Sequence, residues 1–542
     1  MKNKKLYFII LMILFFISIL TLGTKVFGLF PETDVFTKMR VFTEVLNNIK
    51  DFYVDEKNPN DLIDNAIRGM IKELDPHTVI LPPERSQLMD DQFQGFGGIG
   101  IWFNIVDEKI TIMDVFKNGP CDKLGLMRGD QIIKINGESV IGIKRDDVAP
   151  KLKGAPNTSV EVYVERPGWS EPKKFTIIRE DIQPESVIHS FMLTDEIGYI
   201  GMDKFSRTTV EELDNALKEL EGKNVKKLIL DLRENPGGYL PVSVGVADIF
   251  LPGGKKIVYT KGRTSDSMKE YYSTDNDNHP FIPMIILIDE GSASASEIVS
   301  GALQDWDRAL IIGTTSFGKA LVQTPFKLRD ESRLLLTTAR YYTPAGRLIQ
   351  KSYEGKTSEQ YYRDAREMKS IKDLGKSVPD SLTFKTNSGR VVYGGGGIIP
   401  DIIIEETPYI DSTAGKLFNN LDSYAFPFGL GFTFLNEYAE KHSELRKNSE
   451  QFIKSFQINN NIIDEFKSYL KKKGIEINEE EFNKNLDDVK FLMKCELAHQ
   501  LWGVNEFWQV FVQRDTQLKQ AITHFKEAEQ LINKNYSSYI KK

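Results

Sequence analysis

Residues 284–305 read MIILIDEGSASASEIVSGALQD, and the pattern in this stretch decides the class of fold. Its first five residues form a continuous apolar run, which is typical of a β-strand covered on both faces. A turn of glycine, serine and alanine follows, and it opens a helix whose apolar face consists of Ile298, Val299, Ala302 and Leu303. A buried strand that leads directly into an amphipathic helix predicts a layered α/β core.

The rest of the chain extends this pattern and then departs from it. Residues 228–230 form a second buried strand, with a helix expected near 210–220. Between about 95 and 182 the pattern changes to a small β-rich module, with short strands expected at 110–113, 131–135, 160–164 and 175–178. The termini of the exported part are helical: an apolar face recurs from Phe36 to Ile49, and residues beyond 408 are charged and helical.

Two further segments carry expectations of their own. The polar stretch 353–379 is interpreted as a loop or an insertion. Apolar residues recur between 507 and 531 at helical spacing, and we expect one final helix there.

Composition excludes several classes of protein. Of the 542 residues, 41% are hydrophobic and 27% are charged, which excludes wholesale disorder and a polytopic membrane protein. The net charge of −7 gives no general footprint for nucleic acid. Neither of the two cysteines has a second thiol at ligand spacing, and the six histidines are scattered, so we expect no metal and no cofactor.

The amino terminus predicts export. Three lysines precede an apolar run at residues 6–22, which spans roughly 25 Å as a helix. This segment is either a signal anchor or a cleaved signal peptide, and the absence of a clear cleavage pattern favours the anchor. In both cases the chain from about residue 31 onward lies outside the cytoplasm, in the bacterial cell envelope.

The turn at 291–296 is the first candidate for chemistry. A serine at the start of a helix meets free backbone N–H groups and the positive end of the helix dipole, which can stabilise an oxyanion. Ser292, Ser294 and Ser296 all lie there. Taken alone, the turn is more often a set of helix caps and small packing residues.

Two other segments favour chemistry over packing. In TSFGKALVQ (315–323), Lys319 and Gln323 are four residues apart and share a face. A buried lysine can act as a general base, and a glutamine can hold its amine without adding a charge. In DLRENPGG (231–238), glycines after a strand can turn N–H groups into a cleft, although half of such segments are only tight turns.

These segments together resemble the C-terminal processing peptidases, or tail-specific proteases, which are Ser-Lys peptidases with a PDZ domain. The resemblance covers residues from about 35 to 405. It rests on five motifs in the family's order: DLRENPGG (231–238), GSASASEIVSGALQD (291–305), TSFGKALVQ (315–323), LTTARYYTPAGR (336–347) and GGGGIIPD (394–401). One departure is Ala320, where many relatives carry glycine.

The resemblance implies a role for each matching residue. The family's spacing identifies Ser294 as the nucleophile, Lys319 as the general base and Gln323 as its orienting partner. Gly237 and Ala295 match the residues whose N–H groups form the oxyanion hole. The module at 95–182 is similar to the family's PDZ domain, and its loop for a substrate's C-terminal carboxylate matches Gly98, Ile99, Gly100 and Ile101.

The resemblance also implies an overall organisation. The expected fold is multidomain α/β, with a layered peptidase core of the ClpP/crotonase type. The predicted regions are a signal anchor or signal peptide (1–30), a helical region (31–94), the PDZ domain (95–182), the peptidase core (183–405) and a helical region without an assigned role (406–542).

The implied function is a serine endopeptidase that cleaves exported proteins or peptides near their C-termini, without nucleic acid as a partner. The alternative is a dormant or inert scaffold that binds protein C-termini through its PDZ domain. The last region is open to three roles, which are formation of a homo-oligomer, covering of the cleft and binding of an adaptor protein.

Overall fold

The computed structural model describes residues 34–275, 279–367, 380–405, 407 and 431–540. The predicted anchor at 1–30 lies outside these residues. Among the helices that are described, none combines the length and the apolar character needed to cross a membrane. The chain divides into two compact units, one ending at Thr78 and one beginning at Val79. In the first unit, the predicted amphipathic helix is present as α2 (Asp34–Phe52), and α3 (Pro59–Lys72) follows it.

A six-stranded sheet forms the centre of the second unit. Its strands are parallel except for the first, which is antiparallel to its neighbour. In sheet order they are β10 (Val187–Met192), β11 (Ile197–Met202), β12 (Lys227–Asp231), β15 (Met284–Ile288), β16 (Leu310–Gly313) and β21 (Ile402–Ile403). The predicted apolar runs are therefore central strands of an α/β core.

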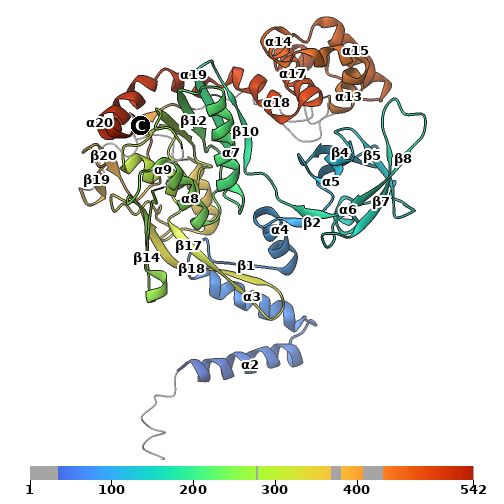
Figure 1. Ribbon diagram of the computed structural model, residues 1–542. Helices are drawn as coiled ribbons and strands as arrows, with labels where there is room; N and C mark the ends of the chain where they lie inside the picture. Colours follow the sequence, from blue (N-terminus) through green and yellow to red (C-terminus); the bar gives the residue numbers. More distant parts are fainter. Residues whose placement is uncertain (1–33, 276–278, 368–379, 406, 408–430, 541–542) are drawn as a thin grey trace, which may run out of the picture. The chain divides into compact units, whose positions relative to one another are not determined.

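Alternate residues of these strands point into two separate hydrophobic clusters. Along β15, Met284, Ile286 and Ile288 pack into one cluster, whereas Ile285 and Leu287 pack into the other. The first cluster is completed by α7 (Thr209–Gly222), α8 (Leu240–Phe250) and α9 (Ala295–Asp305). The second is completed from the C-terminal end of the chain, by α19 (Thr516–Ile522) and α20 (Phe525–Ile540) (Figure 1). The central sheet thus has its second apolar face covered by the last part of the chain.

A second sheet supports the site from another side. Its order is β1 (Val79–Leu81), β18 (Arg333–Tyr342), β13 (Lys256–Gly262) and β14 (Lys269–Tyr272), and β17 (Leu321–Lys327) also pairs with β18. The remaining elements near the core are α4 (Pro83–Phe93), α10 (Ser358–Glu367), β19 (Thr383–Lys385) and β20 (Val391–Tyr393). Helix α10 lies within the segment 353–379 that was expected to be a loop or an insertion, so a loop throughout is wrong for 358–367, and residues 368–379 are outside the described part.

The β-rich module forms a sheet of its own. The four predicted strands lie within β4 (Lys109–Val115), β5 (Gln131–Ile135), β7 (Ser159–Glu165) and β8 (Lys173–Ile178). The sheet order is β3-β4-β5-β7-β8, so β3 (Ile101–Val106) is an edge strand, and β6 (Glu138–Ser139) pairs with β5. Helices α5 (Pro120–Lys123) and α6 (Arg145–Leu152) belong to the module. The chain enters and leaves it side by side, because β2 (Phe96–Gly98) pairs with β9 (Glu180–Ile182).

The C-terminal region is helical, but the single final helix predicted for 507–531 is wrong. The chain there forms α18 (Val504–Phe511), a 3-10 turn at Val512–Arg514, α19 and α20. The break occurs at Asp515, whose side chain caps α19 by accepting a hydrogen bond from the N–H of Leu518 at 2.7 Å. The preceding helices are α13 (Phe432–Lys441), α14 (Ser449–Ser455), α15 (Asn460–Lys472), α16 (Glu479–Lys484) and α17 (Leu486–Trp502).

Candidate active site

Ser294 lies at the junction between β15 and α9. Its backbone has φ +55° and ψ −108°, a conformation that residues with a side chain rarely adopt and that costs about 1–3 kcal/mol. The strained turn leaves Ser294 partly exposed, whereas Ser292 and Ser296 on either side are fully buried. Of the three serines in the motif, Ser294 is the one that a substrate can reach.

The two neighbouring serines have structural partners instead. The hydroxyl of Ser292 donates to the carbonyl of Leu232 at 2.7 Å, and that of Ser296 donates to the carbonyl of Asn235 at 2.8 Å. Both contacts connect the serine turn to the DLRENPGG segment. Ser292 and Ser296 are therefore packing residues, whereas the cap of α9 is Ser294, which forms a capping box with Glu297.

Lys319 and Gln323 are brought together as the sequence predicts. Lys319 lies in the loop between β16 and β17, and its Nζ donates a hydrogen bond to Oε1 of Gln323 at 2.6 Å. Both side chains are partly buried. An amide oxygen orients the lysine amine without the additional negative charge that would favour the ammonium form.

Sequence analysis did not identify Glu297, which connects the serine and the lysine. Its buried carboxylate accepts four hydrogen bonds. Oε2 accepts from the backbone N–H groups of Ser294 at 2.8 Å and Lys319 at 2.9 Å, and Oε1 accepts from the N–H of Gly318 and the hydroxyl of Ser316. One carboxylate oxygen thus fixes the main chain at both predicted catalytic residues. The Ser-x-x-Glu spacing of a capping box is the signal that could have identified it.

Burial raises the pKa of Glu297 to about 7, and the four hydrogen bonds act in the opposite direction by stabilising the charged form. Tyr341 supports the same junction, because its hydroxyl lies 2.7 Å from the carbonyl oxygen of Lys319 and 3.1 Å from that of Ser294. The junction between nucleophile and base is therefore held by two buried side chains.

The two residues predicted for the oxyanion hole lie next to each other. A Cβ atom built on Gly237 would be 2.8 Å from the nitrogen of Ala295 and 2.9 Å from Cβ of Ser294, so only glycine fits at 237. Ala295 is the first residue of α9, and its N–H has no acceptor within the helix. The N–H of Gly237 donates to Oδ1 of Asn235 at 2.9 Å, so an oxyanion would compete with this side chain.

The turn that carries Gly237 is fastened to the serine turn. The carbonyl of Asn235 accepts from the N–H of Ala293 at 3.0 Å, and the N–H of Glu234 donates to Oδ1 of Asp289 at 2.9 Å. Asp289 also accepts from the backbone N–H of Ser292 at 3.0 Å. Burial raises the pKa of Asp289 to about 7. Hydrogen bonds thus join the two loops directly.

The predicted carboxylate loop lies at the start of the β-rich module. Gly98 ends β2, and Gly100 forms the turn to β3 with φ +74°. A Cβ on Gly100 would be 3.2 Å from Pro120, and the positive φ independently favours glycine. The side chains of Ile99 and Ile101 are buried in the core of the module.

Comparisons with known proteins identify the family of the chain. The family models for Peptidase family S41, for the PDZ domain and for a family of unknown function (DUF8443) match residues 196–357, 111–166 and 429–503. The carboxy-terminal-processing protease of Bartonella bacilliformis is 36% identical over 324 residues, which are 59% of this chain and 74% of that protein. The carboxy-terminal processing protease CtpA of Bacillus subtilis is 32% identical over 65% of this chain and 76% of its own length.

A solved structure of a photosystem II D1 C-terminal processing protease is 25% identical, covers 67% of this chain and 92% of that one, and has a TM-score of 0.34. The assignment rests on the sequence relatives, of which the first two are matched over more than two thirds of their length. The chain therefore belongs to peptidase family S41, as a serine-type endopeptidase of the carboxy-terminal processing proteases with a PDZ domain.

Proposed function

We propose that the chain hydrolyses exported proteins or peptides near their C-termini, with Ser294 as nucleophile and Lys319 as general base. The observation that carries this proposal is the convergence of the N–H groups of Ser294 and Lys319 on one carboxylate oxygen of Glu297. This arrangement fixes the main chain at both residues, while Gln323 orients the lysine amine.

The reaction proceeds in two halves. The neutral amine of Lys319 takes the proton of the Ser294 hydroxyl, and Oγ forms a bond to the substrate's carbonyl carbon. The N–H groups of Ala295 and Gly237 stabilise the resulting oxyanion. The C–N bond then breaks, and the lysine ammonium protonates the leaving amine. In the second half Lys319 removes a proton from water, which attacks the acyl ester. The C–Oγ bond then breaks, and the lysine ammonium returns the proton to Oγ of Ser294.

The PDZ domain selects the substrate's end. A peptide adds as a strand to the exposed edge of β3, and its terminal carboxylate binds the backbone N–H groups of the turn formed by Gly98, Ile99, Gly100 and Ile101. The apolar segment at 6–22 directs export, as a membrane anchor or as a signal peptide that is cleaved, and so places the catalytic part outside the cytoplasm. This position gives the enzyme access to exported chains.

The test is a comparison of variants of the full chain, purified in detergent, with an unfolded protein as substrate and a fluorophosphonate probe of active-site serines. We expect Ser294→Ala to abolish both fragment formation and labelling. Lys319→Arg should do the same, because a guanidinium stays protonated at any working pH. Ser292→Ala is the matched control and should remain folded and at least partly active, because its hydroxyl makes structural hydrogen bonds only. Full cleavage by Ser294→Ala would refute the proposal.

A second comparison tests the role of the PDZ turn. The same substrate is offered with a free and with an amidated C-terminus. Charge-assisted hydrogen bonds to a carboxylate contribute about 1.5–3 kcal/mol each, so amidation should slow cleavage about tenfold or more. Equal rates for both substrates would refute carboxylate recognition and leave the assignment of Ser294 untouched.

A further inference from the structure

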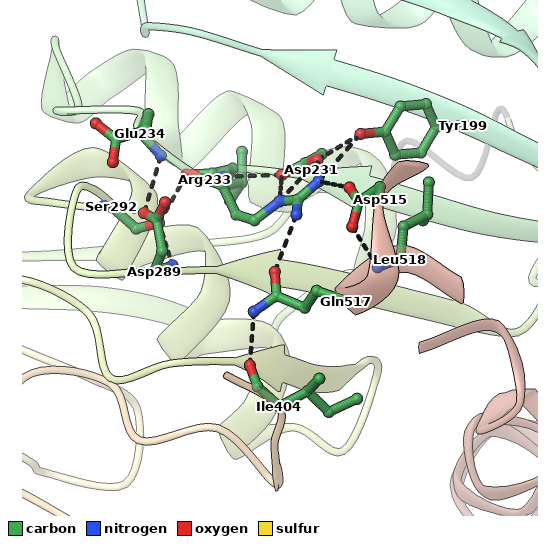
Figure 2. Close-up of polar contacts among 11 residues, drawn as sticks. Tyr199, Asp231, Arg233, Glu234, Asp289, Ser292, Ile404, Asp515, Gln517 and Leu518 are labelled. Carbon is green, nitrogen blue, oxygen red and sulfur yellow. Dashed lines mark hydrogen bonds and ion pairs between the residues drawn. The ribbon is translucent and has the colours of Figure 1, made fainter. Parts of the chain in front are cut away.

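The DLRENPGG segment is in direct contact with the C-terminal end of the chain. Arg233 follows β12 and precedes the turn that carries Gly237. Its Nη2 donates to Oδ2 of Asp515 at 2.7 Å, and its Nη1 donates to Oε1 of Gln517 at 2.9 Å (Figure 2). Asp515 and Gln517 are 2% and 1% exposed, so these contacts are made away from water.

Both C-terminal residues are held firmly on their other side. The second oxygen of Asp515 caps α19 through the N–H of Leu518 at 2.7 Å. The amide nitrogen of Gln517 donates to the carbonyl of Ile404, next to β21, at 2.6 Å. The guanidinium of Arg233 is thus fixed between a helix start and the edge of the central sheet.

On the near side, Arg233 is tied to its own segment. It donates to both oxygens of Asp231, at 3.0 Å from Nε and 2.5 Å from Nη2, and Asp231 also accepts from the hydroxyl of Tyr199 at 2.5 Å. The residues on either side of Arg233 contact the serine turn, because the carbonyl of Leu232 accepts from Ser292 and the N–H of Glu234 donates to Asp289. A continuous set of hydrogen bonds therefore runs from Asp515 to the loop of Ser294.

We propose that Asp515 and Gln517 are positioning residues for catalysis: they hold Arg233, and through it the turn at 234–238, so that Gly237 stays against Ser294 and Ala295. The inference rests on the proposed function of Ser294. It assigns a role to the last part of the chain, which packs against the peptidase core and supports the turn on the oxyanion side of the site.

Stability alone does not account for Asp515. Two buried carboxylates, Asp231 and Asp515, face one guanidinium, so the group carries an excess negative charge. Buried ion pairs are weak contributors to stability because desolvation offsets their attraction. An aspartate here is best explained by the orientation that it imposes on Arg233.

Asp515→Asn separates capping from positioning. Asparagine caps helices as well as aspartate does. When its oxygen accepts from the N–H of Leu518, however, its NH2 group faces Nη2 of Arg233, and two donors oppose each other. A residue that serves only as a cap predicts wild-type behaviour for this variant. A positioning residue predicts a loss of turnover without a loss of fold.

The control is Glu529→Gln. Glu529, in α20, pairs with Lys227 at 3.1 Å, so it connects the same C-terminal region to the opposite end of β12, away from the site. Three quantities are measured on the full-length proteins: kcat and KM on a peptide, the rate of fluorophosphonate labelling, and hydrogen exchange in peptides covering 232–238.

For Asp515→Asn we expect kcat and labelling to fall about tenfold or more, KM to stay within about twofold, and exchange at 232–238 to accelerate. Glu529→Gln should match the wild type in all three. Wild-type turnover and exchange in Asp515→Asn would overturn the proposal, as would an equal loss in Glu529→Gln. If Asp515→Asn fails to fold, Gln517→Met carries the same test, because it removes the hydrogen bond from Arg233 together with the one to the carbonyl of Ile404. A wild type without Ser294-dependent turnover would refute the proposed function, and the exchange data would still decide whether the contact holds the turn.

Discussion

The two loops that flank Ser294 are held by residues at very different distances along the chain. The loop with Lys319 is fixed by Glu297, which lies 22 residues away in the chain and uses a single carboxylate to hold backbone N–H groups. The turn with Gly237 is fixed by Arg233, whose partner Asp515 is 282 residues away. The side of the site that supplies the base is therefore built within two neighbouring motifs, whereas the oxyanion side depends on the far end of the chain.

Substitutions on the two sides of the site should therefore have different effects on activity and on stability. Loss of Glu297 removes hydrogen bonds at the reacting residues themselves, so chemistry should suffer more than stability. Loss of Arg233 leaves buried charges without a partner between the core and the C-terminal region, so stability should suffer first. The following predictions test this contrast.

The largest effect is expected for Arg233→Met. The variant leaves Asp231 and Asp515 buried without a counter-charge, which should lower the free energy of unfolding by about 3–5 kcal/mol. Urea denaturation of the wild type and the variant measures this. Arg514→Met is the control, since Arg514 pairs with Asp488 at a partly exposed position and should cost within about 1 kcal/mol. Equal costs for the two variants would contradict the contrast.

The next effect is a pH dependence from Glu297, whose ordinary pKa of 4.5 is raised to about 7 by burial. The folded chain keeps this proton after the unfolded chain has released it. Its contribution to stability is therefore complete below pH 4.5 and is lost as the pH rises to about 7.

Relative to Glu297→Gln, the wild type should lose on the order of 3 kcal/mol of unfolding free energy across this range. Denaturation curves of both proteins at several pH values measure the difference. The raised pKa of Asp289 is common to both and cancels. Parallel stability curves would show that Glu297 is ionised in the fold throughout.

Glu297→Gln should also lower kcat about 100-fold, which corresponds to about 2.7 kcal/mol of barrier. The NH2 group of glutamine would face N–H donors where the carboxylate accepted them, so Ser294 or Lys319 loses its fixed position. Peptide turnover measures the loss. Glu290→Gln is the nearby control, because Glu290 contacts only the hydroxyl of Thr314 among the described residues. Turnover at the wild-type rate in Glu297→Gln would remove Glu297 from the site.

The smallest effect is expected for Ser296→Ala. Its hydroxyl donates to the carbonyl of Asn235, which keeps a second hydrogen bond from the N–H of Ala293. The cost should be about 1 kcal/mol of stability, with activity within tenfold of the wild type. Thermal unfolding and peptide turnover measure both. Inactivity with an intact fold would mean that Ser296 contributes to the chemistry directly.

Sequence patterns predicted the elements whose partners are close in the chain. The apolar runs of β12 and β15 indicated central strands, and motif spacing brought Lys319 to Gln323. Glu297 was within the same motif but was interpreted only as part of a helix. Its partners are mainly backbone N–H groups, which nearly every residue has, so no particular residue type in the sequence marks them.

The contacts of Asp515 could not be predicted in this way. The apolar spacing from 507 to 531 fits one continuous helix, in which Asp515 would be an internal residue and not a cap. The tertiary contact with Arg233 and the cap at Leu518 outweigh the intrinsic preference for continuing the helix. The spacing of apolar residues gives no information about a hydrogen bond between residues that are far apart in the sequence.

The backbone of Ser294 has a consequence for how variants of this chain should be selected. At φ +55° and ψ −108° glycine is the residue that fits without strain, so Ser294→Gly would relieve part of the about 1–3 kcal/mol stored there. A library of variants ranked by heat resistance would thus enrich proteins without a nucleophile. Selection for thermal stability in this enzyme must therefore include a measurement of turnover, because the backbone conformation at the nucleophile lowers the stability of the fold.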